Sequence, residues 1–188
     1  MDKEKKWKLV EATPAIDLKI LTVEYHYYKN PRNGKTIKTI AIKGNDSVNV
    51  IALTKDKKVI MVRQFRFGIG DYTLELPGGM VDEGESVDIA AKREFREETG
   101  YIGENWKSLG KIQSNPVFMD CLVYHYQVEQ AQVKYELELD EAEDVEVVEV
   151  ALEDIPSLIR DGTIQHPHTI SAFYFANLRG EVRSQTEK

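Results

Sequence analysis

The sequence predicts an α/β fold of the α+β kind, an α/β/α sandwich with a mixed sheet between helices, preceded by a small N-terminal β lobe. Short stretches of alternating apolar and polar residues fill the first third of the chain, one amphipathic helix lies near its middle, and two more helices lie near its end. We therefore expect two parts, the β lobe over residues 1–45 and a larger core domain over residues 46–188.

The expected elements follow in chain order. Residues 7–45 hold WKLVE, KILTVEYHYY and TIKTIAIKG with a PRNG turn at 31–34, which predicts a meander or hairpin. NVIALTK and KVIMVRQFRF predict a strand pair with a turn at 56–58. A helix is expected over 86–99. It is followed by strands at KSLGKIQS, CLVYHYQVEQA and VEVVEVAL, and by helices at EDIPSLIRDG and HTISAFYFANLRG.

Composition and net charge limit the classes of function that this chain can have. A chain of 188 residues with 41% hydrophobic residues can bury the core of one domain. Its net charge of -7, from 32 acidic and 25 basic residues, argues against general binding to a nucleic-acid backbone. A small anionic substrate would then need local cations or metals.

The single cysteine and the N-terminus indicate the compartment. Cys121 allows no intrachain disulfide, and its strand-like neighbours favour a small buried hydrophobic residue over a nucleophile. The N-terminus has no apolar signal region, and no run approaches the length of a membrane span. We expect a cytoplasmic protein with neither membrane nor nucleic acid as a partner.

Residues 79–101 place a glycine turn before a carboxylate cluster. Ser86 is a candidate N-cap and Gly100 a candidate residue just past the C-terminus of the helix. Ile89 and Phe95, with Ala90 or Ala91, are expected to make apolar contacts. The spacing brings three carboxylates onto one face of the helix, those of Glu94, Glu97 and Glu98.

Three like charges on one face repel each other unless a cation lies between them. Hard oxygen ligands suit magnesium or manganese, so the cluster predicts a metal site. Arg93, four residues before Glu97, and Glu85, at the helix start, are candidates to hold these carboxylates in position. The alternative is a solvated acidic helix face with ordinary ion pairs. The Gly78–Gly79 pair and Glu85 at a fixed distance favour the metal site.

On these residues the segment resembles the signature of the Nudix hydrolases, and most closely the branch that acts on ADP-ribose and related nucleotide sugars. The resemblance implies that the backbone carbonyl of Gly78, with Glu94 and Glu98, binds metal, and that Glu97 completes the cluster directly or through water. It also implies a catalytic role for Glu97 and Arg93, and structural roles for Gly79, Glu85 and Gly100. The implied cofactor is Mg²⁺, with Mn²⁺ as a substitute, in two or three ions per site.

The catalytic base is expected in the acidic loop at residues 139–145. The resemblance aligns Glu141 with the base and Glu143 with an additional metal ligand. Asp140 or Glu143 could exchange roles with Glu141, because sequence cannot rank three carboxylates within four positions. A solvated acidic loop is the alternative interpretation.

Candidate substrate contacts have weaker signals. Arg63 and Arg66 end a predicted strand and could reach a phosphate, or could pair with nearby acids at the surface. The resemblance implies a substrate contact at Arg66, and it matches Pro116 with a proline that marks the ADP-ribose branch, although a strand entry also explains a proline. Tyr27 is a candidate to stack on a purine, with packing of the lobe as the alternative. His166 and His168 lie two residues apart and could suggest a metal site. Because no further nitrogen or sulfur ligands lie nearby in the sequence, we interpret them as part of a loop before a helix.

The predicted function is hydrolysis of ADP-ribose or a broader set of nucleoside diphosphate sugars to a nucleoside monophosphate and a sugar phosphate. Three alternatives stay open: a hydrolase that prefers GDP-mannose, a non-catalytic sensor of ADP-ribose, and a hydrolase of damaged nucleoside triphosphates. We also expect a homodimer in which the β lobe is the dimerisation element and helps to build the partner's site, because so short a lobe buries little by itself.

Overall fold

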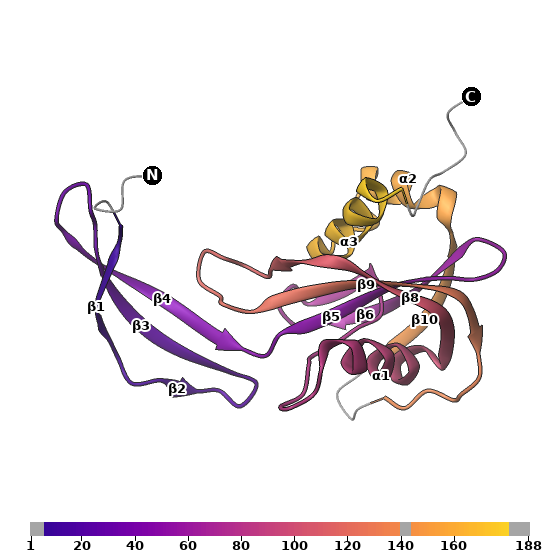
Figure 1. Ribbon diagram of the computed structural model, residues 1–188, viewed down its shortest axis with the longest axis horizontal. Coiled ribbons are helices and arrows are strands. Elements are labelled where there is room, and N and C mark those ends of the chain that lie inside the picture. The colour runs from indigo at the N-terminus through magenta and orange to yellow at the C-terminus, as the bar shows by residue number, and fades with distance from the viewer. Residues whose placement is uncertain (1–5, 140–143, 181–188) are drawn as a thin grey trace. The chain divides into compact units, whose positions relative to one another are not determined.

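A computed structural model of the chain describes residues 6–139 and 144–180. No helix in this described part is long and apolar enough to cross a membrane. Figure 1 shows the elements, whose bounds are β1 Lys8–Ala12, β2 Ile16–Asp17, β3 Leu21–Lys29, β4 Thr36–Gly44, β5 Ser47–Leu53, β6 Lys58–Arg66, β7 Asp71–Glu75, α1 Val87–Thr99, β8 Tyr101–Gln113, β9 Leu122–Val133, β10 Val145–Ala151, the 3-10 turn η1 Leu152–Asp154, α2 Ile155–Arg160 and α3 Pro167–Leu178.

The chain forms two compact units. The first consists of Met1–Asn45 with Gln113–Leu122, and the second of Asp46–Ile112 with Val123–Lys188. The sequence analysis assigned residues 113–122 to the larger domain. They belong to the first unit because they bond to β4, where the backbone N–H of Ile42 donates to the carbonyl of Phe118 at 2.7 Å.

The first unit is a four-stranded antiparallel sheet built around β3. This strand pairs with β1, β2 and β4, and the predicted turn at 31–34 connects β3 to β4. Among residues 6–45 no side chain is buried. The sheet therefore lacks a hydrophobic core of its own.

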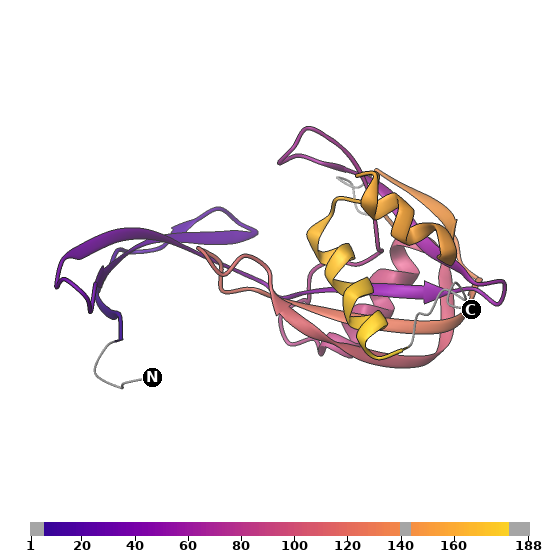
Figure 2. The same ribbon diagram turned by 90° about the horizontal axis from the view of Figure 1, so that it is seen from above.

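The second unit is built on a six-stranded sheet in the order β10-β6-β5-β9-β8, with β7 paired to β6. β5 and β9 run parallel, whereas β6 is antiparallel to β5, β7 and β10. α1 covers one face of the sheet, and α2 and α3 cover the other (Figure 1 and Figure 2). The predicted mixed sheet between helices is confirmed. β7 was not predicted.

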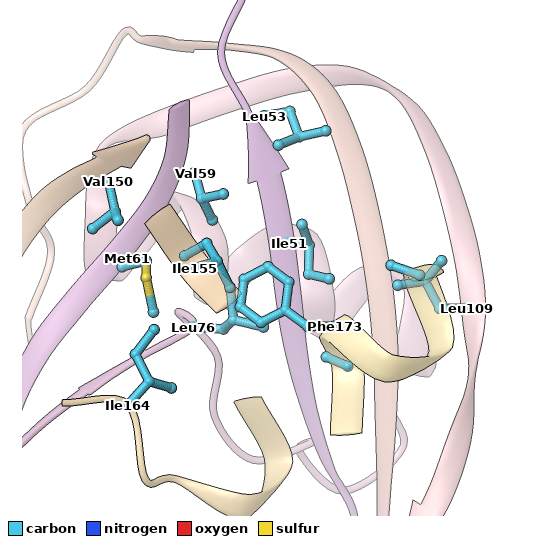
Figure 3. Packing of buried hydrophobic residues seen from close by; sticks show 12 residues of the cluster. Ile51, Leu53, Val59, Met61, Leu76, Leu109, Val150, Ile155, Ile164 and Phe173 are labelled. Carbon is cyan, nitrogen blue, oxygen red and sulfur yellow. The ribbon is translucent and has the colours of Figure 1, made fainter. Parts of the chain in front are cut away.

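Side chains of β5 alternate between two cores because successive residues of a strand point to opposite faces. Val48, Val50 and Ala52 pack with Phe95 of α1. Ile51 and Leu53 point to the other face, where they join a cluster with α2 and α3 (Figure 3). That cluster includes Leu76, Leu109, Ile155, Ile164 and Phe173.

α1 begins after Ser86 and ends at Gly100, as predicted. Gly100 is left-handed, at φ 70°, and its N–H donates to the carbonyl of Arg96. Beyond the helix, Lys134 N donates to Gly100 O at 2.9 Å and Glu138 N donates to Glu97 O at 2.9 Å. The chain therefore returns to the C-terminal end of α1 just before the acidic stretch.

The apolar contacts of α1 differ in part from the expectation. Ala90, Ala91 and Phe95 are buried, but Ile89 is 60% exposed. It follows Asp88 in the first turn and lies on the outer face of the helix, away from the sheet.

Candidate active site

A glycine turn lies across the edge of β5. Val50 N donates to Pro77 O at 3.0 Å, and Val48 N donates to Gly79 O at 2.9 Å. Gly78 has φ +152°, and a Cβ there would lie 2.1 Å from the carbonyl oxygen of Val48. Only glycine therefore fits at position 78.

Two glutamates of α1 converge on this turn. The N–H of Gly78 donates to the Oε2 atom of Glu98 at 2.7 Å, and the Glu98 side chain is buried. A Cβ on Gly79 would lie 2.6 Å from the carboxylate carbon and both oxygens of Glu94. The turn and the helix thus hold the two carboxylates at one place.

Arg93 organises the carboxylates around the start of α1. Its guanidinium donates to Glu85 at 2.8 and 3.0 Å, to Glu94 at 2.8 Å, to Glu97 at 3.2 Å and to the Met80 carbonyl at 3.0 Å. The pairing with Glu85 is the main cause that raises the pKa of Arg93 and lowers the pKa of Glu85. Both groups therefore remain charged near neutral pH.

Glu97 is paired with two arginines. Its carboxylate is held by Arg93 and also by Arg96, whose Nη2 lies at 3.0 Å. Within residues 6–139 and 144–180, no three side chains of His, Cys, Asp or Glu are grouped so as to hold a metal ion. The Glu97 carboxylate thus lies between two arginines, and its part in a metal site stays a prediction.

The remaining oxygens fit a hard cation. Glu94 and Glu98 supply carboxylates, and the Gly78 carbonyl belongs to the same turn. The carbonyls on either side, of Pro77 and Gly79, accept hydrogen bonds from β5, whereas that of Gly78 accepts none from the described residues. Two carboxylates and a backbone carbonyl are ligands that suit Mg²⁺, which completes its coordination with water.

A cavity of about 320 Å³ opens beside the turn, within the second unit. Arg66 and Glu75 form part of its wall. Arg66 donates to Glu75 through Nε at 2.7 Å and Nη2 at 2.9 Å, and Glu75 is 1% exposed. The cavity is lined by Ser47, Val48, Asn49, Arg66, Glu75, Leu76, Gly78, Gly79, Met80, Val123, His166 and His168.

The two predicted arginines differ in position. Arg66 lines the cavity and is also paired with Glu75, so its contact with substrate stays a prediction. Arg63 does not line the cavity, because it faces the surface over the Tyr72 ring at 4.9 Å and lies 3.7 Å from a carboxylate oxygen of Glu146. Its surroundings match the alternative of a surface strand residue that pairs with an acid.

His166 and His168 are functional candidates that the sequence analysis set aside. His166 is the N-cap residue of α3, and its Nε2 lies 3.3 Å from Glu75. Burial is the main cause that lowers the pKa of His166. The sequence shows two histidines at the start of a predicted helix. It does not show which cavity this end of the helix lines.

A buried polar network continues beneath α3. The Nδ1 atom of His125 lies 2.7 Å from the Oδ1 atom of Asn49, and its Nε2 lies 3.0 Å from the hydroxyl of Ser171. Burial lowers the pKa of His125 to about 4, so the ring is neutral at pH 7. The network links the cavity wall on β5 to the first turns of α3.

Pro116 and Tyr27 lie in the first unit. Pro116 lines a separate open groove of about 710 Å³, whose other walls include Trp7, His26 and Tyr28. Tyr27 is half-buried on β3 and is not among the residues that line this groove. The ring of Tyr28, rather than that of Tyr27, faces the groove beside His26, at 5.9 Å between centroids.

The predicted base and the additional ligand, Glu141 and Glu143, lie outside the described residues, as does Asp140. The first described residue after them, Asp144, accepts a hydrogen bond from the Tyr72 hydroxyl at 2.7 Å.

A glycine turn set against two glutamates of one helix, on a mixed sheet between helices, is the arrangement that the resemblance to the Nudix hydrolases implies. Residues 44–187 match the NUDIX domain family, and the chain belongs to this family of hydrolases. It is 35% identical over 154 residues to an ADP-ribose pyrophosphatase of Bacillus subtilis (strain 168), which covers 81% of this chain and 83% of that protein. It is 31% identical over 152 residues to a methanol dehydrogenase activator of Bacillus methanolicus, which covers 80% and 82%.

A solved structure supports the fold. The crystal structure of an ADP compounds hydrolase matches with a TM-score of 0.84 and covers 98% of this chain and 100% of that one. At 23% sequence identity, this likeness concerns the fold alone.

Proposed function

We propose that this Nudix hydrolase is a magnesium-dependent pyrophosphohydrolase of ADP-ribose and related nucleoside diphosphate sugars. The products would be a nucleoside monophosphate and a sugar phosphate. The convergence of the Gly78 and Gly79 turn with Glu94 and Glu98 carries the proposal. The name of the Bacillus subtilis relative supports ADP-ribose as the first substrate to test.

The described residues have separate tasks in this reaction. Glu94, Glu98 and the Gly78 carbonyl would hold Mg²⁺, and Arg93 keeps the Glu94 carboxylate oriented. A bound Mg²⁺ supplies positive charge against the diphosphate oxygens and lowers the pKa of water. Arg66 would donate to a phosphate oxygen through its planar fork.

The reaction adds water across the diphosphate. Oxygen of the water bonds to one phosphorus, and the bond from that phosphorus to the bridging oxygen breaks. The proton passes to a carboxylate, for which we propose Glu141. The bridging oxygen leaves with the other phosphate.

The test is a Glu98→Gln variant. Glutamine can still accept the hydrogen bond from Gly78 N, so the turn is kept while the negative charge is lost. We expect kcat with ADP-ribose and Mg²⁺ to fall by roughly 10²-fold or more. Glu83→Gln, an exposed carboxylate two residues from Glu85, is the matched control and should retain activity.

A substrate panel separates the candidates. ADP-ribose, GDP-mannose, UDP-glucose and diadenosine polyphosphates would be assayed by phosphate release after a coupled phosphatase. Preference for GDP-mannose would replace the proposed substrate. Tight binding of ADP-ribose without magnesium, with no turnover when magnesium is added, would instead indicate a sensor.

We also propose that the chain acts as a homodimer through its first unit. This sheet buries no side chain among residues 6–45, and it exposes Trp7, Ile20 and Ile40 at 51%, 68% and 49%. Exposed apolar side chains of this kind favour contact with a second copy. Light scattering during gel filtration should give about twice the mass of the chain, whereas a monomer mass at micromolar concentration would contradict the proposal.

A further inference from the structure

The first turn of α3 forms one wall of the cavity beside the glycine turn. His166 and His168 both line this cavity, with ring centroids 5.0 Å apart. Arg66 and Glu75 are part of the same wall, because His166 lies 3.3 Å from the carboxylate that Arg66 holds. The two imidazoles therefore share a cavity with a cation next to the proposed metal ligands.

This turn of α3 is held firmly to the glycine segment. Leu76 N donates to the hydroxyl of Thr169 at 3.1 Å in a buried hydrogen bond. The Ser171 hydroxyl donates to the His168 carbonyl at 2.9 Å and also lies 3.0 Å from His125. The positions of the imidazoles are thus set by the same contacts that set the catalytic turn.

Two polar atoms at the cavity have no partner within the described residues. The Nδ1 atom of His166 is buried and makes no hydrogen bond there. Arg66 uses Nε and Nη2 on Glu75, and no hydrogen bond to a described residue uses its Nη1. The Nη1 group of Arg66, whose side chain is 41% exposed, would donate to an oxygen atom of a ligand in this cavity.

The size and lining of the cavity indicate the ligand class. A volume of about 320 Å³ is at the lower end of ligand-binding pockets and suits one half of a nucleoside diphosphate sugar. The lining offers donors in Arg66 and the histidines, which suit the oxygen atoms of a phosphate and of sugar hydroxyls. The lining residues include no Phe, Tyr or Trp on which a purine could stack.

We propose that this cavity binds the sugar phosphate half of the substrate, and that His166 and His168 determine which sugar is accepted. This inference rests on the proposed function. It assigns substrate contacts to α3, a helix outside the glutamate-rich segment.

Binding can be measured without turnover. The protein would be labelled at histidine ring carbons and titrated with ribose 5-phosphate or with AMP while ring resonances are recorded. We expect ribose 5-phosphate to shift the resonances of His166 and His168, and AMP at equal concentration to shift them much less. Resonances that respond to neither ligand, or only to AMP, would overturn the inference.

Kinetics provide the second measurement. His166→Gln and His168→Gln should each raise KM for ADP-ribose by about tenfold and change kcat by less than about threefold, since each removes one contact to a bound substrate. Tyr174→Gln introduces the same residue on an exposed position of the same helix and should leave KM unchanged. Unchanged KM in both histidine variants would contradict the inference.

The two proposals fail differently. Ring shifts with ribose 5-phosphate in a protein that hydrolyses no diphosphate sugar would support the binding site and reject only the proposed function. Hydrolysis of ADP-ribose without any response of the histidine rings to ribose 5-phosphate would support the proposed function and reject the binding site.

Discussion

Gly79 lies so close to the Glu94 carboxylate that a Cβ at this position would be 2.6 Å from its carbon and both oxygens. The backbone at Gly79 is not left-handed, so the need for glycine comes from this contact alone. The glycine therefore makes room for a carboxylate.

Gly79→Ala should displace Glu94 and reduce kcat/KM for ADP-ribose by roughly 10²-fold, because the carboxylate would leave its place against the glycine turn. Circular dichroism should remain that of the wild type. Gly68→Ala is the matched control, since a Cβ there has no atom within 4 Å and no unusual φ. Equal activity of the two variants would show that Glu94 need not lie against the turn.

Manganese binding should depend on both glutamates of the turn. In paramagnetic titrations we expect Glu94→Gln and Glu98→Gln each to weaken Mn²⁺ binding by about tenfold or more, because each removes a charged oxygen ligand. Glu83→Gln should bind as the wild type does. Wild-type affinity in Glu94→Gln would place the ion elsewhere.

Arg66→Lys should raise KM for ADP-ribose by about tenfold. One ammonium group cannot both replace the two hydrogen bonds to Glu75 and present a donor to the cavity. Arg160→Lys, at the exposed end of α2, serves as the control for the same change of residue. A KM within twofold of the wild type for Arg66→Lys would remove Arg66 from substrate binding.

The acidic stretch provides a test of the base. Glu141→Gln should lower kcat by roughly 10²- to 10⁴-fold with little change in substrate affinity, as expected for loss of a general base. Glu153→Gln, an exposed residue of η1, is the control. Near-normal turnover of Glu141→Gln would transfer the role to Asp140 or Glu143.

Stability should fall in mild acid because of His125. Its folded pKa, about 4, is below the unfolded value of 6.5, so the native state favours the neutral ring. This contribution is complete above pH 6.5 and is lost as the pH falls from 6.5 to about 4. It amounts to roughly 3 kcal/mol in free energy of unfolding.

Urea unfolding at several pH values between 7 and 4 measures this loss. His125→Gln removes the titrating ring, so its free energy of unfolding should change less over the same range. The difference between the two proteins isolates His125 from the acidic groups that also titrate. Parallel curves for the two proteins would contradict the assignment.

The sequence predicted best what depends on neighbours along the chain. The end of α1 follows from Gly100, and the convergence of Glu94 and Glu98 follows from helical spacing. The helix also starts after Ser86 as predicted, although the Ser86 side chain makes no cap hydrogen bond. The pairing of Glu97 with both Arg93 and Arg96 could not be predicted, because it depends on side-chain orientation.

Long-range contacts account for the remaining differences. β7 escaped prediction because Asp71–Glu75 carries few apolar residues, and it is stabilised by its pairing with β6. Pairing with β4 also places Gln113–Leu122 in the first unit. His166 and His168 reach the cavity through long-range contacts of α3, among them the buried hydrogen bond from Leu76 to Thr169.

The hydrogen bonds from Lys134 and Glu138 to the end of α1 have a consequence for how such an enzyme can diversify. They give the stretch at 140–143 a point of origin on the helix that carries Glu94 and Glu98. The sequence that follows can therefore be varied, by evolution or by design, while the attachment of residues 134–138 to α1 is kept. Loop grafts that retain residues 134–138 are for that reason the natural starting point for changing selectivity.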